Sequence, residues 1–341
     1  MPNPSQQIRT IGRTGLEVTS LGFGSAWLGA VGAKLSEAAS VKMIETVFDA
    51  GLNYFDTAPL YGHGLSEKRL GSVLSTVPRD DFVLSTKVGR LLVDPSLGER
   101  NPLMSDTENV SVIYDYSYDG ARRSIEESLE RLKLDRIDIV YCHDIDVWTH
   151  GNDQPRVYKE AIAGILPALC DLRREGTIGA FGLGVNEWEV CDRVMDDADV
   201  DCFLLAGRFT LLEQAPLQQF LPKCVDNNIS IVIGGPFNSG LLVANDRSKA
   251  TFDYKPVDDA RWQKAQAMRA ICDKHNVELA AAALQYPLRH AAVSSVIPGC
   301  ADLRQLQANI DLANADIPDA LWRELADTGH APYISINKLS S

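Results

Sequence analysis

The stretch GLNYFDTAPLYGHGLSEKRLG, residues 51–71, contains a short apolar run that stops at a charged residue. Asp56 follows the run directly, and Tyr61 comes five residues later, ahead of a Gly-His-Gly turn and a new segment of helical period. A strand that is buried on both faces and is followed by a loop and a helix is the repeating unit of parallel α/β sheets. The stretch therefore predicts one such unit, with polar side chains at the carboxyl end of its strand.

The rest of the chain repeats this unit. Residues 8–19 alternate around a Gly-containing turn and are expected to form a hairpin. Eight apolar runs are predicted as buried strands, over residues 21–23, 53–55, 82–86, 137–141, 180–183, 202–205, 230–233 and 295–297. Eight strand–helix units indicate an α/β fold, a closed (β/α)8 TIM barrel, with the hairpin plugging its bottom. No linker rich in Pro, Gly or Ser interrupts the pattern, so residues 1–341 are expected to form a single domain.

Helices are expected between the strands. The main candidates cover residues 36–50, 66–75, 120–133, 161–175, 217–227 and 259–275. Ser36 and Ser66 are the expected N-caps, and Gly51 and Gly176 lie where helices are expected to end. Two long connections, 89–119 and 234–258, follow the third and seventh strands, on the face where such barrels carry out their chemistry. We expect both to frame the active site.

Composition excludes several kinds of protein. The 341 residues carry a formal net charge of -13, which disfavours binding to nucleic acid or to an anionic membrane surface. No apolar run approaches the roughly 20 residues that span a bilayer, and the N-terminal sequence lacks signal-peptide features, so a cytoplasmic location is expected. The seven cysteines show neither a CxxC pair nor metal-ligand spacing, and we expect reduced, mostly buried thiols.

Four ionisable residues follow three successive predicted strands. Asp56 and Tyr61 follow the second strand, Lys87 the third and His143 the fourth. A free tyrosine titrates near ~10, and an adjacent ammonium group is expected to lower the pKa of Tyr61. Asp56 would hold Lys87 charged, and His143 would position a substrate oxygen or share its proton. The set predicts a general acid/base site that moves a proton on and off an oxygen.

Simpler interpretations apply to single residues. Asp56 and Lys87 alone would suit a structural ion pair, and His143 alone a core histidine. His63 and Glu67 are expected in the turn and on the surface. The segment HDIDVWTHGND matches no recognised metal-site spacing and is expected to be a solvated loop that binds no metal, although it offers five potential ligands: His143, Asp144, Asp146, His150 and Asp153.

The segments NYFDTAPLYGHGLSEKRLG, LSTKVGR, IDIVYCHD and SSVIPGC resemble the signatures of the aldo-keto reductase superfamily, and the likeness extends from about residue 8 to residue 329. The resemblance implies a TIM barrel that binds NAD(P) without a Rossmann domain, and indeed no GxGxxG fingerprint is present. It also implies a catalytic tetrad of Asp56, Tyr61, Lys87 and His143, in which Tyr61 handles the proton while hydride passes between nicotinamide and a carbonyl carbon.

The resemblance further implies the cofactor contacts, which are Gly24, Ser25, Asp56, Asn186, Pro236, Phe237, Asn238, Gly240, Leu241, Gly299, Gln305 and Asn309. The chain departs from the family pattern at three carboxamide and ring contacts, where it has Val185, Ala206 and Gly234. Phe237 or Arg208 is the candidate replacement. Gly299 and Gln305 occupy the usual basic positions around the 2′-phosphate, which favours NAD over NADP.

The segments STKVGR, AGRFTLLEQ and GGPFNSGLL resemble a subgroup that oxidises sugars such as L-fucose, D-threo-aldoses and galactose at the anomeric carbon, and pyridoxal 4-dehydrogenases share the pattern. The expected function is NAD-linked oxidation of an aldose at C1 to the lactone, with pyridoxal 4-dehydrogenation as the alternative. The expected substrate contacts are Trp27, Tyr61, His143 and Trp148, although Trp148 would equally suit a packed loop.

Two other classes stay open at this point. A metal-dependent isomerase or aldolase would use the same barrel with ligands from several strand ends. A non-catalytic NAD-binding regulatory subunit, as in potassium-channel β subunits, would keep the fold without turnover. A small molecule is the expected partner, and the oligomeric state is left open.

Overall fold

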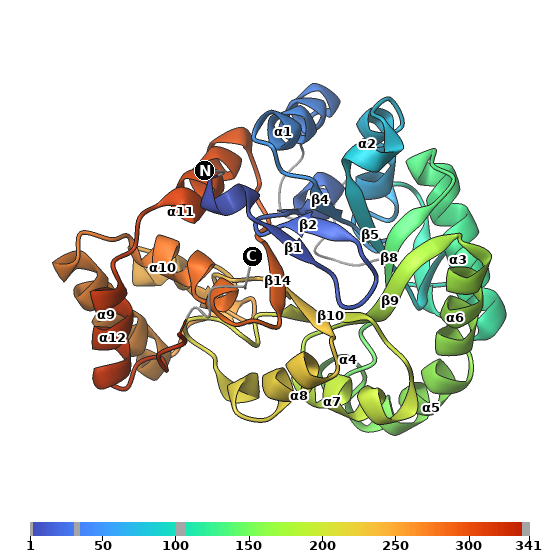
Figure 1. The fold of residues 1–341 in the computed structure, drawn as a ribbon. Coiled ribbons are helices and arrows are strands. Elements are labelled where there is room, and N and C mark those ends of the chain that lie inside the picture. Colours follow the sequence, from blue (N-terminus) through green and yellow to red (C-terminus); the bar gives the residue numbers. More distant parts are fainter. Residues whose placement is uncertain (1–2, 31–34, 100–106, 336–341) are drawn as a thin grey trace.

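Eight parallel strands form the centre of the molecule in the computed structural model, which describes residues 3–30, 35–99 and 107–335 (Figure 1). The strands are β3 (Phe23–Gly24), β4 (Tyr54–Asp56), β5 (Val83–Val88), β8 (Ile137–His143), β9 (Ile178–Val185), β10 (Cys202–Ala206), β11 (Ser230–Gly234) and β14 (Val293–Ile297). They pair in the order β14-β11-β10-β9-β8-β5-β4-β3. Parallel bridges from Leu21 to Val296 and from Gly24 to Gly299 join the last strand to the first. The predicted (β/α)8 barrel is confirmed.

Helices surround the strands, because each carries one apolar face that must be buried (Figure 1). They are α1 (Glu37–Asp49), α2 (Leu65–Leu74), α3 (Tyr118–Leu132), α4 (Val147–His150), α5 (Gln154–Ala163), α6 (Ile165–Glu175), α7 (Trp188–Asp197), α8 (Phe220–Asp226), α9 (Asp259–Lys274), α10 (Leu279–Gln285), α11 (Leu303–Asn314) and α12 (Asp319–Asp327).

The predicted helix ends are mostly confirmed. The Ser36 hydroxyl caps α1 by accepting a hydrogen bond from the backbone N–H of Ala39 at 3.2 Å. Gly51 and Gly176 follow α1 and α6 with positive φ angles of 70° and 79°. The N-cap prediction for Ser66 is wrong, because α2 begins at Leu65 after Gly64. Ser66 instead lies buried inside the helix and bonds to Ser25.

An N-terminal hairpin closes one end of the barrel, as expected. Its strands are β1 (Ile8–Thr10) and β2 (Glu17–Thr19), and its ribbon lies across the strands in Figure 1. Ile11 and Val18 are fully buried and pack with side chains from inside the barrel, such as Tyr54 and Tyr141. A separate, larger apolar cluster fills the layer between the strands and the helices. The hairpin leaves the opposite end as the open mouth.

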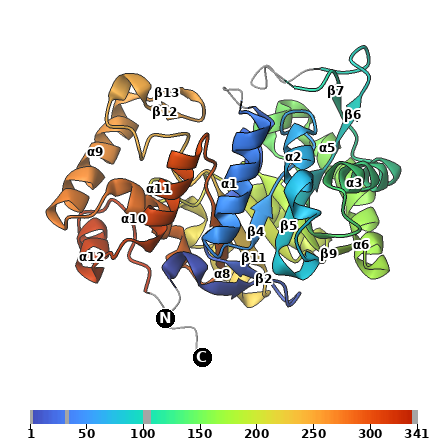
Figure 2. The same ribbon diagram turned by 90° about the horizontal axis from the view of Figure 1, so that it is seen from above.

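Two further hairpins occupy the long connections that were expected as loops. The pair β6 (Arg90–Val93) and β7 (Ser111–Tyr114) follows β5, and the pair β12 (Thr251–Phe252) and β13 (Lys255–Pro256) follows β11. Figure 2 shows both hairpins at the end of the molecule away from β2 and the N-terminus. They therefore flank the mouth of the barrel, as predicted for these two connections.

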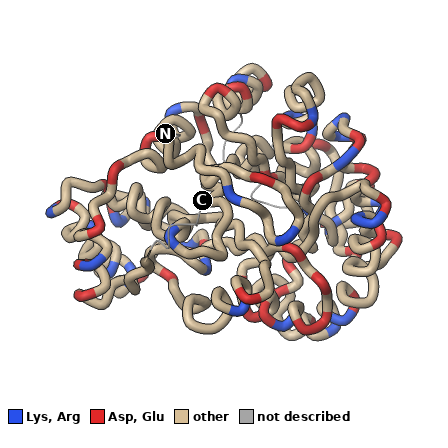
Figure 3. Tube along the Cα trace, viewed as in Figure 1, with Lys and Arg blue, Asp and Glu red and all other residues tan. Residues whose placement is uncertain are grey.

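The cysteines follow the expected pattern. All seven cysteines are free, and all but Cys170 are buried, as predicted. Acidic and basic residues are interspersed along the outer helices in Figure 3. Among the described residues, none of the helices combines the length and the apolar character needed to cross a bilayer.

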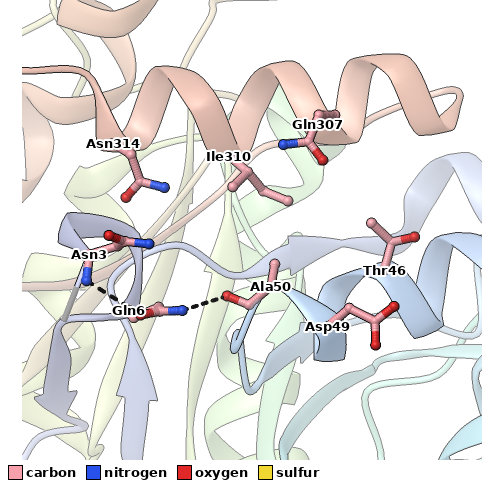
Figure 4. A pocket seen from close by; sticks show the side chains of 8 residues that line it. All are labelled: Asn3, Gln6, Thr46, Asp49, Ala50, Gln307, Ile310 and Asn314. Atoms are coloured by element: carbon pink, nitrogen blue, oxygen red, sulfur yellow. Dashed lines mark hydrogen bonds between the residues drawn. The ribbon is translucent and has the colours of Figure 1, made fainter.

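A shallow hollow lies beside the N-terminal hairpin, on the plugged side of the barrel (Figure 4). Gln6 projects into it and donates from Nε2 to the carbonyl of Ala50 at 2.9 Å. Neutral polar side chains such as Asn314 line most of its wall, with Asp49 as the charged group. The hollow contains none of the four residues predicted to be catalytic.

Gly182 lies where β9 leaves no room for a side chain against β10. It pairs with Cys202 across β9 and β10, and a Cβ at this position would lie 1.7 Å from the Cys202 carbonyl oxygen. We expect Gly182→Ala to force the strands apart and to lower the free energy of unfolding by about 3 kcal/mol, the upper end of overpacking penalties. Gly234→Ala is the matched control, because its Cβ would approach no atom closer than Leu204 Cδ2 at 3.4 Å. Equal denaturation midpoints for the two variants would contradict the prediction.

Candidate active site

Three adjacent strands bring the predicted tetrad together at the mouth. β4, β5 and β8 are neighbours in the sheet, and Asp56, Lys87 and His143 lie at or near their carboxyl ends. Tyr61 follows β4 in a turn that packs against Gly29, where a Cβ would lie only 2.4 Å from the Tyr61 carbonyl carbon. The parallel register of the sheet thus gathers side chains that are up to 87 positions apart in the sequence.

Asp56 and Lys87 form a buried ion pair. Each residue is 2% exposed, and Lys87 Nζ lies 2.7 Å from Asp56 Oδ2. The ammonium also donates to the carbonyl of Thr57 at 2.8 Å, and the other carboxylate oxygen accepts from the Ser85 hydroxyl at 2.6 Å. Buried charges are retained when hydrogen bonds satisfy the remaining polar atoms, and this pair meets that condition.

Tyr61 lies directly against this pair. Lys87 Nζ is 4.7 Å from the centre of the half-buried Tyr61 ring. The ring of His143, 7% exposed, is 6.4 Å away, centre to centre, and stands perpendicular to it. One phenol, one ammonium and one imidazole therefore converge within the reach of a single bound oxygen.

Burial controls the protonation of these groups. It would lower the pKa of Lys87, but Asp56 and Tyr61 outweigh it, so the pKa is raised and the lysine stays charged. Burial, with Arg90 and Lys87, holds the pKa of His143 well below its usual value, so the ring is neutral. Burial raises the pKa of Tyr61, although Lys87 opposes the shift. The expectation that its pKa would fall is therefore wrong, because desolvation outweighs the attraction to the ammonium.

Beneath the tetrad, polar side chains continue into the barrel. The Ser85 hydroxyl is 3.0 Å from the hydroxyl of Tyr54, which in turn is 3.2 Å from that of Tyr141. Sequence reasoning overlooked Ser85, although it lies two residues before Lys87 and therefore faces the same side of the strand. Because side chains on a strand alternate between its two faces, this spacing could have identified Ser85 as a neighbour of the site.

A second ion pair adjoins the tetrad and was not predicted. The Asp144 carboxylate accepts from Arg90 Nη2 at 2.5 Å and from Asn186 Nδ2 at 3.1 Å. Its Oδ2 lies 3.4 Å from Nε2 of His143. Burial is the main reason that the pKa of Asp144 rises to about 6, against the opposing charge of Arg90. Arg90 lies on β6, so no local sequence pattern placed it beside His143.

The other half of the rim is lined by glycine. Gly24 and Gly299 bridge at the ends of β3 and β14, and Gly207, Gly234 and Gly235 lie at the ends of β10 and β11. A Cβ at Gly207 would have no neighbour closer than 3.7 Å. At Gly207, Gly234 and Gly235 no atom lies closer than 3.4 Å to the place where a side chain would begin, so a flat ring can approach these strand ends, whereas Trp27 fills that space at Gly299. The rim therefore fits a nicotinamide dinucleotide.

The predicted cofactor residues occupy different settings around this rim. The Ser25 hydroxyl is fully buried and donates to the carbonyl of Asp56 at 2.6 Å, so it holds strand ends together. Asn238 is also buried, and it bonds to Thr210 and to the carbonyl of Gly207. Asn186 uses its amide nitrogen toward Asp144 and Asp146, and no described residue donates to its Oδ1. Asn186 Oδ1 could therefore accept a hydrogen bond from the carboxamide N–H of a nicotinamide.

The remaining predicted cofactor residues lie after β11 and β14. Pro236 and Leu241 are buried, and Phe237 packs against the apolar core. Gly240 has a positive φ of 100° and open space around it. Exposed Gln305 lies on the first turn of α11 and accepts from the Ala301 N–H, while Asn309 is buried further along that helix.

The two tryptophans predicted to contact substrate lie on different sides of the mouth. Trp27 packs over Gly299, where a Cβ would lie 2.9 Å from its Cδ1. Trp148 is half exposed on α4, and the guanidinium of Arg208 lies 5.4 Å from its ring centre. Asp253, at the tip of the β12–β13 hairpin, pairs with Arg208 at 3.1 Å. Arg208 thus links three mouth loops.

The segment 143–153, considered for metal ligands, has other partners. Asp146 caps α4 through Thr149 and accepts from the backbone N–H of Asn186 at 2.7 Å. Asp153 pairs with Arg156 on the surface. Within residues 3–30, 35–99 and 107–335, no group of three or more His, Cys, Asp or Glu side chains has the arrangement of a metal site.

Two residues of the opening stretch differ from expectation. Glu67 is fully buried, and it accepts from Thr86 Oγ1 at 2.7 Å and from Arg131 Nε at 2.6 Å. The prediction that it lies on the surface is wrong, because the first turn of α2 faces β5 and α3. His63 lies in the turn, as expected, but it is also buried and contacts Thr107.

The chain is similar to known proteins over most of its length. The model of the Aldo/keto reductase family matches residues 20–328. Pyridoxal 4-dehydrogenase of Microbacterium luteolum is 41% identical over 94% of this chain and 97% of its own. D-threo-aldose 1-dehydrogenase of a Pseudomonas species is 41% identical over 93% and 96%. The holo form of an aldo-keto reductase from Bacillus halodurans superposes with a TM-score of 0.73 at 23% identity, over 98% of this chain and 99% of that one.

Proposed function

The chain belongs to the aldo/keto reductase family, and from this premise we propose that it oxidises an aldose at C1 to the lactone with NAD as the cofactor. The observation that carries the proposal is the contact of Tyr61 with the buried Asp56–Lys87 pair, beside a neutral His143. These groups can move a proton at an oxygen, and the glycine-lined rim next to them leaves room for a nicotinamide.

The residues of this chain handle the proton and the oxygen. His143, neutral and buried, can hold the C1 oxygen of the hemiacetal by a hydrogen bond. The Tyr61 phenolate, which the charged Lys87 stabilises, takes the proton of that oxygen as the C1–H bond breaks and becomes the neutral hydroxyl. A nicotinamide bound beside Tyr61 would supply the acceptor for the hydride that leaves C1. Gly24 and Asn186 are the groups we assign to the nicotinamide end of the cofactor, and Gly299 is assigned to its adenosine end.

Two substrate classes have support. The relatives named above, at 41% identity each, are a D-threo-aldose 1-dehydrogenase and a pyridoxal 4-dehydrogenase. Three aromatic side chains are largely exposed in the described part of the chain, and all belong to loops or hairpins at the mouth: Tyr114, Trp148 and Tyr254. Aromatic side chains left open to solvent around a site are available to cover a ligand, and both a sugar face and a pyridine ring would fit. Pyridoxal is therefore the second candidate.

NAD is the preferred cofactor in this proposal. The first turn of α11 follows the N-cap Asp302 and carries Gln305 at the position that is usually basic, with the basic Arg304 one residue before it. A 2′-phosphate here would lack a charge-assisted partner at position 305 and would lie near a carboxylate. NADP is expected to bind more weakly for this reason.

The test is nicotinamide absorbance with NAD or NADP and a panel of L-fucose, D-arabinose, L-galactose, D-galactose and pyridoxal. We expect NADH formation with at least one aldose and a lower rate with NADP. Turnover of pyridoxal alone would replace the aldose by the second candidate. NAD binding without any turnover would favour a regulatory subunit, and loss of activity on chelation would favour a metal-dependent enzyme.

A further inference from the structure

The Arg90–Asp144 pair is a built feature of the mouth that the tetrad does not explain. Asp144 directly follows β8 with a left-handed φ of 50°, a conformation that costs free energy in a residue other than glycine. Its backbone is fixed from both sides, because its N–H donates to the Gly184 carbonyl at 2.9 Å and its own carbonyl accepts from Tyr116 and His150. The fold holds this side chain in a strained position beside the catalytic histidine.

The carboxylate is poised as an acceptor rather than as a cation site. Arg90 neutralises its charge, and Arg90 in turn lies 5.0 Å from the ring centre of Tyr114. An ionised carboxylate offers about four acceptor positions, and Arg90, Asn186 and His143 account for three neighbours. One acceptor position is left for a neutral donor such as a hydroxyl group.

The distance to His143 places that acceptor next to the reacting carbon. A substrate oxygen that is hydrogen-bonded to His143 Nε2 would lie about 3 Å from that nitrogen. Asp144 Oδ2 is 3.4 Å from the same nitrogen, so a hydroxyl on the neighbouring carbon of the substrate falls within its reach. We propose that Asp144, oriented by Arg90, binds the C2 hydroxyl of the aldose and thereby selects 2-hydroxy substrates. The inference rests on the proposed aldose oxidation.

The experiment compares two substrates in two proteins. The aldose that the wild-type protein oxidises fastest and its 2-deoxy counterpart are assayed with wild type and with Asp144→Asn, and kcat/KM is measured for each. Hydrogen bonds to charged groups are worth enough for a preference of about 10-fold to 100-fold. We expect the wild-type preference for the 2-hydroxy sugar to collapse by that factor in Asp144→Asn, mainly through KM.

The ratio of kcat/KM for the two sugars distinguishes recognition of the C2 hydroxyl from a structural role of Asp144. A merely structural role of Asp144 would lower kcat/KM for both sugars alike and leave their ratio unchanged, which would overturn the inference. Intrinsic reactivity differences between the sugars cancel, because the same pair is used with both proteins. Asp153→Asn is the matched control, since Asp153 pairs with Arg156 on the surface and should leave the ratio at its wild-type value. NADH binding and the melting temperature confirm that each variant is folded.

The pH dependence gives a second readout. The pKa of Asp144 is about 6, so the carboxylate accepts above that pH and loses this capacity as it is protonated below it. The preference for the 2-hydroxy sugar should therefore fall from pH 7.5 to pH 5 in wild type and stay flat in Asp144→Asn. A flat wild-type profile would contradict the assignment. Several charged and titratable groups face Asp144. They are Lys87 on β5, Arg90 on β6, Tyr116 after β7, Cys142 and His143 on β8, Asp146 at the start of α4, His150 at its end, and Tyr61 and Tyr254 in the mouth loops.

The two proposals can fail separately. If the wild-type protein oxidises no aldose, the proposed function falls and the inference falls with it. If it oxidises an aldose and the ratio is the same in Asp144→Asn, only the inference is overturned.

Discussion

Tyr61→Phe is expected to lower kcat by about 10²-fold to 10⁴-fold, the usual contribution of a general acid/base. The substitution removes only the hydroxyl and leaves the ring that lies 4.7 Å from Lys87 Nζ. The Asp56–Lys87 ion pair does not depend on that hydroxyl, so the fold and the binding of NAD should be preserved. Steady-state kinetics with the best substrate, with cofactor binding measured alongside, check the prediction.

Tyr118→Phe provides the matched control for this substitution. Tyr118 lies at the start of α3, outside the mouth, and its hydroxyl donates to Asp171 at 2.8 Å. The control should retain the wild-type kcat. A Tyr61→Phe protein that keeps kcat within tenfold of wild type would show that another group carries the proton.

Lys87→Met is expected to abolish activity and also to destabilise the fold by about 3–5 kcal/mol, the cost of leaving one partner of a buried ion pair uncompensated. Asp56 would keep the Ser85 hydroxyl but lose the ammonium, in a position that is 2% exposed. Because the pKa of Lys87 is raised, the pair contributes fully at neutral pH and is lost as the pH rises through that raised value. Chemical denaturation at pH 7 gives the free energy of unfolding.

The double variant Asp56→Asn/Lys87→Met separates stability from catalysis. Removing both charges eliminates the uncompensated carboxylate, so much of the lost stability should return. Activity should stay absent, because the phenolate of Tyr61 would still lack its ammonium. If the double variant is as unstable as Lys87→Met, side-chain packing rather than charge explains the loss.

The barrel could be predicted because its signals are local. The run over residues 137–141 corresponds to β8, Ile137–His143, and the run over 180–183 to β9, Ile178–Val185, each extended by the pairing with its neighbour. A continuous apolar run indicates a strand that is buried on both faces, and the run can be recognised from the sequence of that segment alone. The hairpins β6–β7 and β12–β13 were not predicted, since their short strands are defined by the partner they meet.

The tetrad could be predicted for a related reason. Asp56, Lys87 and His143 each end or closely follow a buried run, and parallel strands bring their carboxyl ends to one face. The order of these residues along the chain was therefore enough to predict that they are neighbours in the folded protein. Asp144 was visible next to His143, but its partner Arg90 is 54 residues away on a hairpin, so the pair had no sequence signal.

The barrel, its plugged end and the identity of the four residues at the mouth follow from local sequence, because the burial and the direction of each strand depend on the residues of that segment. The tertiary structure decided that Glu67 is buried, that Arg208 pairs with Asp253, and that the pKa of Tyr61 rises instead of falling. These features depend on contacts between loops and on the balance between desolvation and charge. Both are set only when distant segments of the chain pack together.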